Sequence, residues 1–431
     1  MKLNDITIKV HRFGPLENVA FKIAPMMIFT GMSSLGKSYA NYLVYYFMSS
    51  VCNDNLLKPF KDEKGNEVVA KKFVFDLDVF LEGLSVHVES YMRNFLGDDN
   101  LICKVEFKMP KRTRTVAIEI KKAEPNTPEN EEQELMHRPQ PYEIGIEGKQ
   151  RRIVPNINYA HFHAERIIQE FILGGMVGRE VILPPGRGAF VGENFSVKSE
   201  IASSMNMYNL YFRDYDFGIN ARIRYRRELD NHLPERLLGL TSGGDLFSVE
   251  GKQFLQLNDK ERIALSAGAS SIKDLSPWLF YLKNQWMMSC SFCMEEPEAH
   301  QHPSVTVQIA DVMAIAMHQP AANMFHLTTH SDYLIQRLNQ LVKLGNIRRK
   351  NISLFRNICE ERGLDEQSYL DASDIKAYYF KKDGKGKTIV EALDVTDDGI
   401  PMKSFFDVVN DLSEREEYIN EAIYRMEKGE Q

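Results

Sequence analysis

The amino-acid sequence predicts an α/β protein whose main sheet is mixed and carries a phosphate-binding loop. The first observation is a strand, a loop and a helix in succession: an apolar strand at 26–30, a loop from Gly31 to Gly36, and an apolar segment at 38–48 without Pro or Gly, which indicates a buried helix. The second is the final third of the chain, where apolar strands alternate with helices. Alternation of this kind predicts parallel strands.

The other elements are expected from the same patterns. Near the start of the chain, two strands at 4–10 and 19–23 flank a turn at Gly14-Pro15. In the first half we then expect strand-like runs at 69–77, 102–109 and 115–120 and a mobile loop at 121–141. The middle of the chain is expected to contain a polar helical stretch at 195–238, a hairpin at 240–257 and a helix from about Ile272. The last part is expected to contain strands at 287–294, 324–330, 374–380 and 387–395, helices at 305–317 and from Tyr333, and a charged amphipathic helix at 404–426.

Composition limits the class of protein. The 431 residues are 43% hydrophobic, which is enough for a large core, and the formal net charge of −7 excludes a global basic field that would attract nucleic acid. The five cysteines are few and odd in number, which favours reduced thiols. Because no apolar run is long enough for a signal peptide or a membrane span, we expect a cytoplasmic protein without membrane contact.

These patterns divide the chain into four predicted segments. They are an N-terminal lobe with the glycine loop at 1–50, an inserted antiparallel β arm with a mobile loop at 51–153, a helical subdomain at 154–280, and a C-terminal lobe at 281–431.

The most specific motif is the glycine loop. Gly31-Met32-Ser33-Ser34-Leu35-Gly36-Lys37-Ser38 is a full GxxxxGK[ST] match between a strand and a helix. Glycines allow backbone N–H groups to surround phosphates, and the following helix N-terminus favours negative charge. We expect these eight residues and Tyr39 to bind a nucleotide, with Lys37 on the β- and γ-phosphates and the Ser38 hydroxyl on Mg²⁺. The alternative is a chance glycine turn.

Two adjacent carboxylates follow a buried strand. Glu295 and Glu296 directly follow the run 287–294 and open the segment EEPEAHQHP. Neighbouring residues on a strand end face opposite ways, so Glu295 is expected to face Mg²⁺ and Glu296 the water that attacks the γ-phosphate. The alternative is a solvated charged turn.

Two further segments contain candidate phosphate ligands. His330 ends the apolar strand 324–330 and is placed to hydrogen-bond a γ-phosphate, although a capping or core histidine is the simpler alternative. Ser266 and Gly268 lie in a cluster of small residues before a helix, which is an anion-binding helix start. The alternative for that cluster is an ordinary serine N-cap.

With these motifs in order, the chain resembles the ABC-type ATPases of the RecF, SMC and OLD group, of the AAA-15 and AAA-21 style. The opening strands and glycine loop look like that group's Walker A region, EEPEAHQHP like its Walker B and D-loop, LTTHSDYLI like its switch-histidine segment, and LSAGASS like its signature sequence. The segments NYAHFHAERII and LPPGRGAF look like its Pro-Ala-x-Arg region. The chain departs from the group at Ser33, Ser34, Ala267 and Ala269, and its Q-loop glutamine stays unassigned.

The resemblance implies an ABC-type ATPase head: a mixed sheet with a P-loop, an antiparallel β arm and a helical signature subdomain. It implies ATP and Mg²⁺ as cofactors and a head-to-tail homodimer, or a higher homo-oligomer, closed around ATP. Glu296, His330 and Lys37 would be catalytic, Ser38 and Glu295 would hold Mg²⁺, and Ser266 and Gly268 would reach the nucleotide of the other subunit.

The process that this ATPase would serve is inferred only by analogy with the group that the chain resembles. No Toprim nuclease set follows His330, and standalone ATPases of this group often work with a separate effector, a nuclease or toxin, in bacterial anti-phage defence. We therefore expect a regulatory or sensor ATPase.

Two alternatives remain open. A DNA-binding repair or chromosome-maintenance ATPase would use the basic run Arg222, Arg224, Arg226 and Arg227, which otherwise is a solvated helix face. An ATP-regulated nuclease would use His161 with His163, expected to alternate on a strand, or His300 with His302. The acidic residues at 371–374 are interpreted as turn residues.

Overall fold

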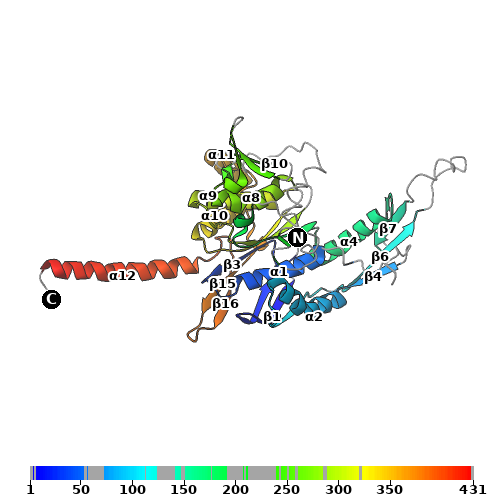
Figure 1. Cartoon of the computed structure of the whole chain (residues 1–431), viewed down its shortest axis with the longest axis horizontal. Coiled ribbons are helices and arrows are strands. Elements are labelled where there is room, and N and C mark those ends of the chain that lie inside the picture. The colour runs from blue at the N-terminus through cyan, green and yellow to red at the C-terminus, as the bar shows by residue number, and fades with distance from the viewer. Residues whose placement is uncertain are drawn as a thin grey trace, which may run out of the picture.

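The computed structural model is built on a six-stranded sheet, with a β arm on one side and a long helix leaving the other (Figure 1). The residues that the structure describes are 3, 6–52, 56, 72–111, 113–123, 141–146, 151–175, 177–191, 207, 210–211, 239–241, 244–249, 252–257, 261–284, 289–319 and 323–428.

The main sheet is mixed, as the sequence predicts. Its strand order is β16 (Thr388–Leu393), β15 (Ile375–Lys382), β3 (Met26–Gly31), β14 (Met324–Thr328), β13 (Cys290–Glu295) and β9 (Arg179–Leu183). All neighbours are parallel except β15 and β16, which form an antiparallel pair. The strands β3, β13 and β14 are buried along their whole length, as expected for parallel strands covered on both faces. The α/β fold class is confirmed.

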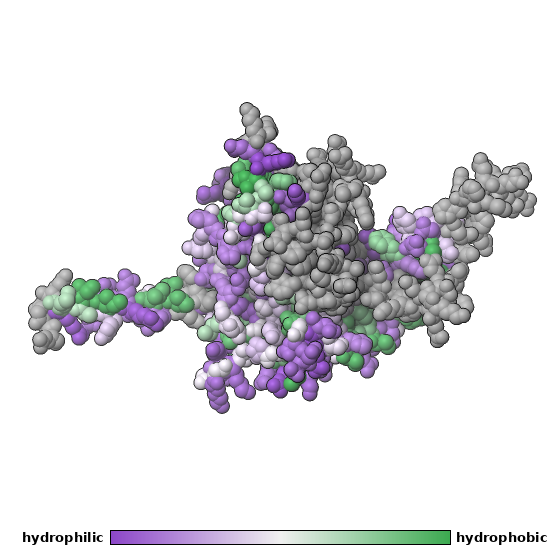
Figure 2. Space-filling model, viewed as in Figure 1, coloured by the Kyte–Doolittle hydropathy of each residue, from purple (hydrophilic) through white to green (hydrophobic). Residues whose placement is uncertain are grey.

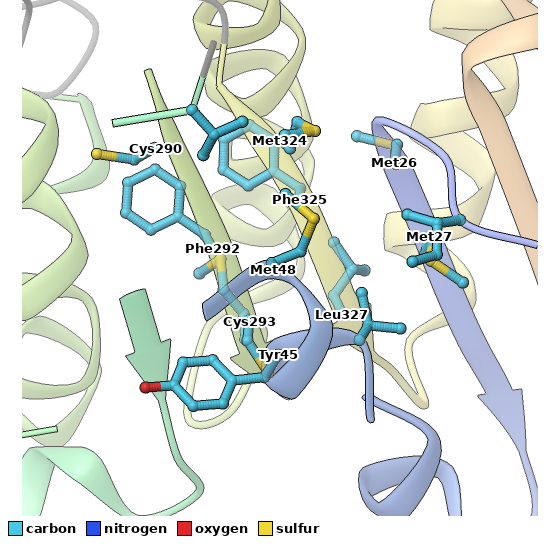
Figure 3. Close-up of a cluster of buried hydrophobic side chains, with 14 of the residues drawn as sticks. Met26, Met27, Tyr45, Met48, Cys290, Phe292, Cys293, Met324, Phe325 and Leu327 are labelled. Carbon is cyan, nitrogen blue, oxygen red and sulfur yellow. The ribbon is translucent and has the colours of Figure 1, made fainter. Parts of the chain in front are cut away.

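The core fills the space between this sheet and helix α1 (Lys37–Cys52) (Figure 3). Phe292 on β13 stacks on Phe325 of β14 with ring centroids 5.4 Å apart. Met27 on β3 and Tyr45 and Met48 on α1 contribute to the same apolar cluster (Figure 3). Helix α1 is buried on most sides because it packs against β3, β9, β13 and β14 of the main sheet. The predicted buried helix at 38–48 is confirmed.

A second sheet contains the two strands that precede β3 and the glycine loop. It has the antiparallel order β2 (Leu16–Lys22), β1 (Thr7–Phe13) and β5 (Cys103–Lys108). The two strands predicted around Gly14-Pro15 are therefore confirmed, with bounds shifted by a few residues. The third strand, β5, comes from the predicted arm and pairs with β1 instead of with the arm's own strands.

The arm is antiparallel, as predicted, but its described part also contains a helix. Its sheet has the order β4 (Lys72–Asp76), β6 (Thr115–Lys122), β7 (Tyr142–Ile146) and β8 (Arg151–Val154). Helix α2 (Leu77–Leu96) was not predicted: Asp76 caps its start by accepting from the N–H groups of Asp78 and Val79, and Gly97 ends it in the left-handed conformation. The predicted loop at 121–141 lies largely outside the described residues.

One strand prediction is wrong. His161 and His163 lie in helix α4 (Ile157–Leu173), which Asn156 caps by accepting from Tyr159 N and Gly174 ends. Two residues apart on a helix, the two imidazoles point in different directions, so they do not share a face as metal ligands would. Among the described residues no group of three His, Cys, Asp or Glu side chains is placed to hold a metal ion.

The described segment before strand β13 contains a hairpin. Strands β10 (Asp245–Val249), β11 (Lys252–Gln256) and β12 (Arg262–Ala264) form an antiparallel sheet, which confirms the predicted hairpin. A short turn, η6 (Leu265–Ala267), leads into helix α8 (Ser270–Asn284), two residues earlier than predicted. The predicted helical stretch at 195–238, with its arginine run, lies almost wholly outside the described residues.

The remaining helices follow the strands of the C-terminal half. Helix α9 (Pro303–Met317) and helix α10 (Asp332–Lys350) pack together, and α11 (Ile352–Arg362) follows α10 directly. A short turn, η7 (Ala372–Asp374), precedes β15, and α12 (Lys403–Lys428) ends the described chain. None of the described helices combines the length and hydropathy that crossing a bilayer requires. The predicted segment boundaries stay a prediction.

Two helical glycines allow a matched test of this packing. A Cβ on Gly345 of α10 would lie 2.0 Å from the carbonyl oxygen of Leu370, whereas one on Gly83 of α2 would meet nothing within 4 Å. We expect Gly83→Ala to stabilise the protein by about 0.5–1 kcal/mol and Gly345→Ala to destabilise it by at least ~1 kcal/mol. Urea unfolding measures both, and a stabilising Gly345→Ala would contradict the packing described.

A buried histidine predicts how stability depends on pH. His326 on β14 is fully buried, and burial lowers its pKa to about 4. Since the unfolded chain binds this proton near pH 6.5 and the folded chain does not, stability falls as pH drops below that value. We expect wild type to lose roughly 2 kcal/mol more than His326→Gln between about pH 7 and pH 5. Equal losses in denaturant titrations at the two pH values would contradict this.

Candidate functional site

The glycine loop has a backbone that its glycines make possible. Gly31 and Gly36 have φ values of 113° and 93°. A Cβ on Gly31 would lie 2.2 Å from the carbonyl oxygen of Phe380 on β15, and one on Gly36 would lie 2.8 Å from the side chains of Pro15 and Leu16. The loop is therefore held between β15 and the β1–β2 turn, and both motif glycines are required by close contacts.

Lys37 lies at the start of α1 and turns back over the loop. Its Nζ donates to the carbonyl oxygens of Gly31 at 3.1 Å and Met32 at 2.7 Å. Burial lowers its pKa to about 8, against the opposing effect of Glu296 and Glu295. A phosphate bound here would place negative charge beside the ammonium group and favour its protonated form.

Glu295 connects three segments of the chain. Its Oε2 accepts hydrogen bonds from Ser38 Oγ at 2.6 Å and Thr328 Oγ1 at 2.9 Å, and its Oε1 accepts from Asn41 Nδ2 at 3.1 Å. Burial raises the pKa of this carboxyl, and the three hydrogen bonds oppose that rise. Asn41 and Thr328 were not predicted. Asn41 lies one turn after Ser38 on the buried face of α1, which is the signal that could have identified it.

The donors around Glu295 fit a magnesium ion. Ser38 Oγ and Glu295 Oε2 are hard oxygen ligands that meet at the edge of the phosphate loop. Mg²⁺ is commonly held by one or two carboxylates, substrate phosphates and waters, so it does not need a larger protein cage. The residues present therefore fit the ion that the sequence predicts.

Glu296 and His330 meet beside the loop. His330 Nε2 lies 3.8 Å from Glu296 Oε1, and both side chains are partly exposed. Glu296 has a φ of 44°, a left-handed conformation that costs a non-glycine residue on the order of 1–3 kcal/mol. Its N–H donates to the carbonyl oxygen of Thr328 at 3.1 Å, which holds this turn against β14. Burial and the Lys37 charge lower the His330 pKa, against the effect of Glu296.

These residues surround one pocket of about 580 Å³. It is lined by Pro15, Ser33, Ser34, Gly36, Lys37, Ser38, Tyr39, Glu296, Thr328 and His330. Most of the predicted nucleotide and catalytic residues are thus together. Of the other loop residues, Leu35 is buried in the core and Met32 is exposed. Ser266 and Gly268, in the turn just before α8, do not line this pocket, and Ser266 faces solvent.

Glu298 is a further buried carboxylate that sequence reasoning missed. Its Oε1 accepts from Thr329 Oγ1 at 2.6 Å and from the backbone N–H of His330 at 2.9 Å. Burial raises its pKa, and these hydrogen bonds oppose the rise. The contact fixes the backbone of His330, so Glu298 is a positioning residue for the histidine.

A buried arginine joins this strand end to helix α8. Arg187, in the turn η4 (Arg187–Phe190), is only 1% exposed. Its Nε donates to the carbonyl oxygen of Asp274 on α8 at 2.7 Å, and its Nη1 donates to the carbonyl oxygen of Glu295 at 2.7 Å. One guanidinium therefore bridges helix α8, which follows the Ser266 turn, and strand β13, which ends at Glu295.

The two histidines after Glu296 have structural partners. His300 Nδ1 lies 2.6 Å from Oδ2 of Asp274, whose Oδ1 accepts from Gly188 N at 2.8 Å. The His302 ring accepts from Ser304 N and caps α9. This pair therefore belongs to the turn between β13 and α9.

Comparisons with known proteins found distant structural likeness only. No family model matches the chain, and no curated protein matches it. Solved structures that align with it include an SMC head bound to the C-winged helix domain of ScpA (11% identity, 91% of this chain, 97% of that chain, TM-score 0.38). Others are an SMC head domain from Thermotoga maritima (9% identity, 90% and 98%, TM-score 0.34) and the Smc head domain with an extended coiled coil from Pyrococcus furiosus, bound to the C-terminal domain of ScpA (8%, 94% and 98%, 0.35). Scores this low carry no argument about function.

The Arg187 bridge can be tested by substitution. Arg187→Met leaves buried carbonyl oxygens without donors, so we expect it to lower the free energy of unfolding by about 3 kcal/mol or more. Arg356, whose ion pair with Glu366 is exposed, is the matched control, and Arg356→Met is expected to cost less than about 1 kcal/mol. Equal, small losses for both variants in chemical unfolding would show that the bridge does not hold these segments together.

Proposed function

We propose that this protein binds ATP with Mg²⁺ in the glycine-loop pocket and hydrolyses it to ADP and phosphate. The observation that carries the proposal is the contact between Ser38 and Glu295, 2.6 Å apart at the edge of a pocket that Lys37, Glu296 and His330 also line. Loop, lysine, hydroxyl and carboxylate together make a phosphate and magnesium site, and Glu296 supplies a base beside it.

Each residue has a separate role in binding. The loop N–H groups surround the phosphates, and Lys37 leaves its carbonyl partners to pair with the β- and γ-phosphates. Ser38 and Glu295 would hold the metal, which neutralises phosphate charge when it is bound. Asn41 and Thr328 keep the Glu295 carboxylate oriented through their hydrogen bonds.

Hydrolysis needs a base for the attacking water. Glu296 is half exposed at the pocket, so its carboxylate can take a proton from a water molecule as the water oxygen bonds to the γ-phosphorus and the bond to the β–γ bridging oxygen breaks. His330, which lies beside Glu296 and whose backbone N–H donates to Glu298, would donate a hydrogen bond to the γ-phosphate.

We further propose that a second copy completes the site. Ser266 and Gly268 lie outside the pocket, just before α8, and the exposed Ser266 hydroxyl is open to another subunit. Arg187 would transmit the state of the Glu295–Glu296 turn to that helix. A pair that closes on ATP and opens after hydrolysis is suited to controlling a separate effector, which supports a regulatory ATPase; its use in anti-phage defence is an analogy.

The two alternatives are less well supported. The nuclease hypothesis draws no support from the described residues, where His161 and His163 point apart and His300 and His302 have other partners. The arginine run of the DNA-binding hypothesis falls outside the described residues, so that hypothesis stays a prediction.

The proposal predicts that Glu296→Gln separates binding from hydrolysis. The amide cannot accept a proton from water, so we expect phosphate release to fall at least about a hundredfold while ATP binding is retained. Glu366→Gln, at an exposed carboxylate on another part of the chain, is the matched control. Assays include plasmid DNA and tRNA: wild type is expected to consume ATP and leave both intact.

Three results would contradict the proposal. They are no ATPase activity in wild type, full activity in Glu296→Gln, or nucleic acid cut by wild type alone.

A further inference from the structure

Helix α12 projects from the body of the protein with an uncovered apolar stripe. Figure 1 shows the helix running away from the sheets, and Figure 2 shows apolar side chains gathered along it. Every residue from Val408 to Met426 is exposed. Leu412 is 57% exposed and Ile419 is 56% exposed, which is unusual for aliphatic residues on a long helix.

The spacing of the stripe is that of a helix pair. Val409, Leu412, Ile419, Ile423 and Met426 follow one another at intervals of three, seven, four and three residues. These intervals place the five residues at the a and d positions of a heptad repeat, which form the core of a helix pair. The interval of seven skips one core position, which Glu416 occupies.

The helix has little to stabilise it alone. Ion pairs one turn apart, Asp411 with Arg415 at 2.8 Å and Glu421 with Arg425 at 2.6 Å, each contribute only a few tenths of a kcal/mol to an isolated helix. Most helical stability in proteins comes from packing of an apolar face. The stripe therefore indicates a partner.

The charges of α12 exclude two classes of partner. Residues 403–428 contain seven acidic and four basic side chains. Helices that lie on an anionic lipid surface carry Lys and Arg on the polar face, and nucleic-acid contacts require the same sign of charge. An acidic amphipathic helix with heptad spacing fits another helix instead.

We propose that α12 pairs in antiparallel orientation with α12 of a second copy of this chain. In that register Val409 lies opposite Met426 of the partner subunit, and Leu412 lies opposite the partner's Ile423. Glu416, the one polar core position of the stripe, then lies opposite the partner's Ile419 and not opposite a second Glu416. A parallel pair in register would place two Glu416 carboxylates against each other in the core, which disfavours that orientation.

The pairing is symmetric and closes on itself. One two-fold axis relates the helices, so each apolar residue is used once on each side and no stripe is left over. Side chains that are each about half exposed on two such helices would remove on the order of 1,000 Å² from water, the size at which specific interfaces begin. The contact uses none of the nucleotide-pocket residues, so it does not depend on ATP.

The experiment measures the mass of the full chain by sedimentation equilibrium in nucleotide-free buffer. Wild type is expected to dimerise at micromolar concentration, and Ile419→Glu to raise the dissociation constant at least about a hundredfold. Tyr418→Glu is the matched control: Tyr418 is 75% exposed and lies off the stripe, so the same new charge there should leave the dimer intact. Because both residues are exposed, both variants should fold.

Cross-linking tests the orientation. A chain with Leu412→Cys and Ile423→Cys is expected to form disulfide-linked dimers on mild oxidation, and Leu412→Cys alone is not. The native cysteines are buried or half-buried, and wild type oxidised in the same way measures the cross-linking that they cause. A monomeric wild type, or a dimer that Ile419→Glu leaves unchanged, would overturn the proposal. Efficient cross-linking by Leu412→Cys alone would overturn the antiparallel orientation. Dimerisation that appears only with ATP would belong to the nucleotide site.

Discussion

The candidate site depends on the buried carboxylate of Glu295. It is the point where the N-terminal strand–loop–helix unit meets the strands of the C-terminal half, through Ser38 and Asn41 on one side and Thr328 on the other. A carboxylate this deep is costly unless its oxygens are hydrogen-bonded, and here both accept hydrogen bonds. Fixing Glu295 also fixes Glu296, the next residue, at the mouth of the pocket. The glycine loop and Glu296 are therefore positioned by one interaction between segments more than 250 residues apart.

The parts that the sequence predicted are those specified locally. The strand, loop and helix around Lys37 follow from glycine spacing and apolar runs, and so do the strands that end at Glu295 and His330. Helix α2 was missed, although its buried residues recur at helical spacing and Asp76 and Gly97 are cap signals. Helix α4 was misread because alternating His161 and His163 imitate a strand pattern inside a capped helix.

The residues that support the site were not predictable in the same way. Asn41, Thr328, Glu298 and Arg187 act through partners far away in sequence, and none belongs to a motif of the phosphate loop. Arg187 illustrates the difficulty, because its partners are backbone carbonyl oxygens, which every residue possesses. Only the fold reveals that it joins helix α8 to the strand of Glu295. The stripe on α12, by contrast, is visible in the sequence, but its exposure is known only from the structure.

Direct titration of the protein with ATP and Mg²⁺ tests the central claim, which is that the pocket lined by Lys37, Ser38 and Glu296 is a nucleotide site. Isothermal titration calorimetry on wild type and Lys37→Ala gives the stoichiometry and the affinity. The account predicts one nucleotide per chain for wild type and an affinity at least about a hundredfold weaker for Lys37→Ala, which loses the phosphate-binding ammonium group. No binding to wild type, or equal binding to the two proteins, would contradict it.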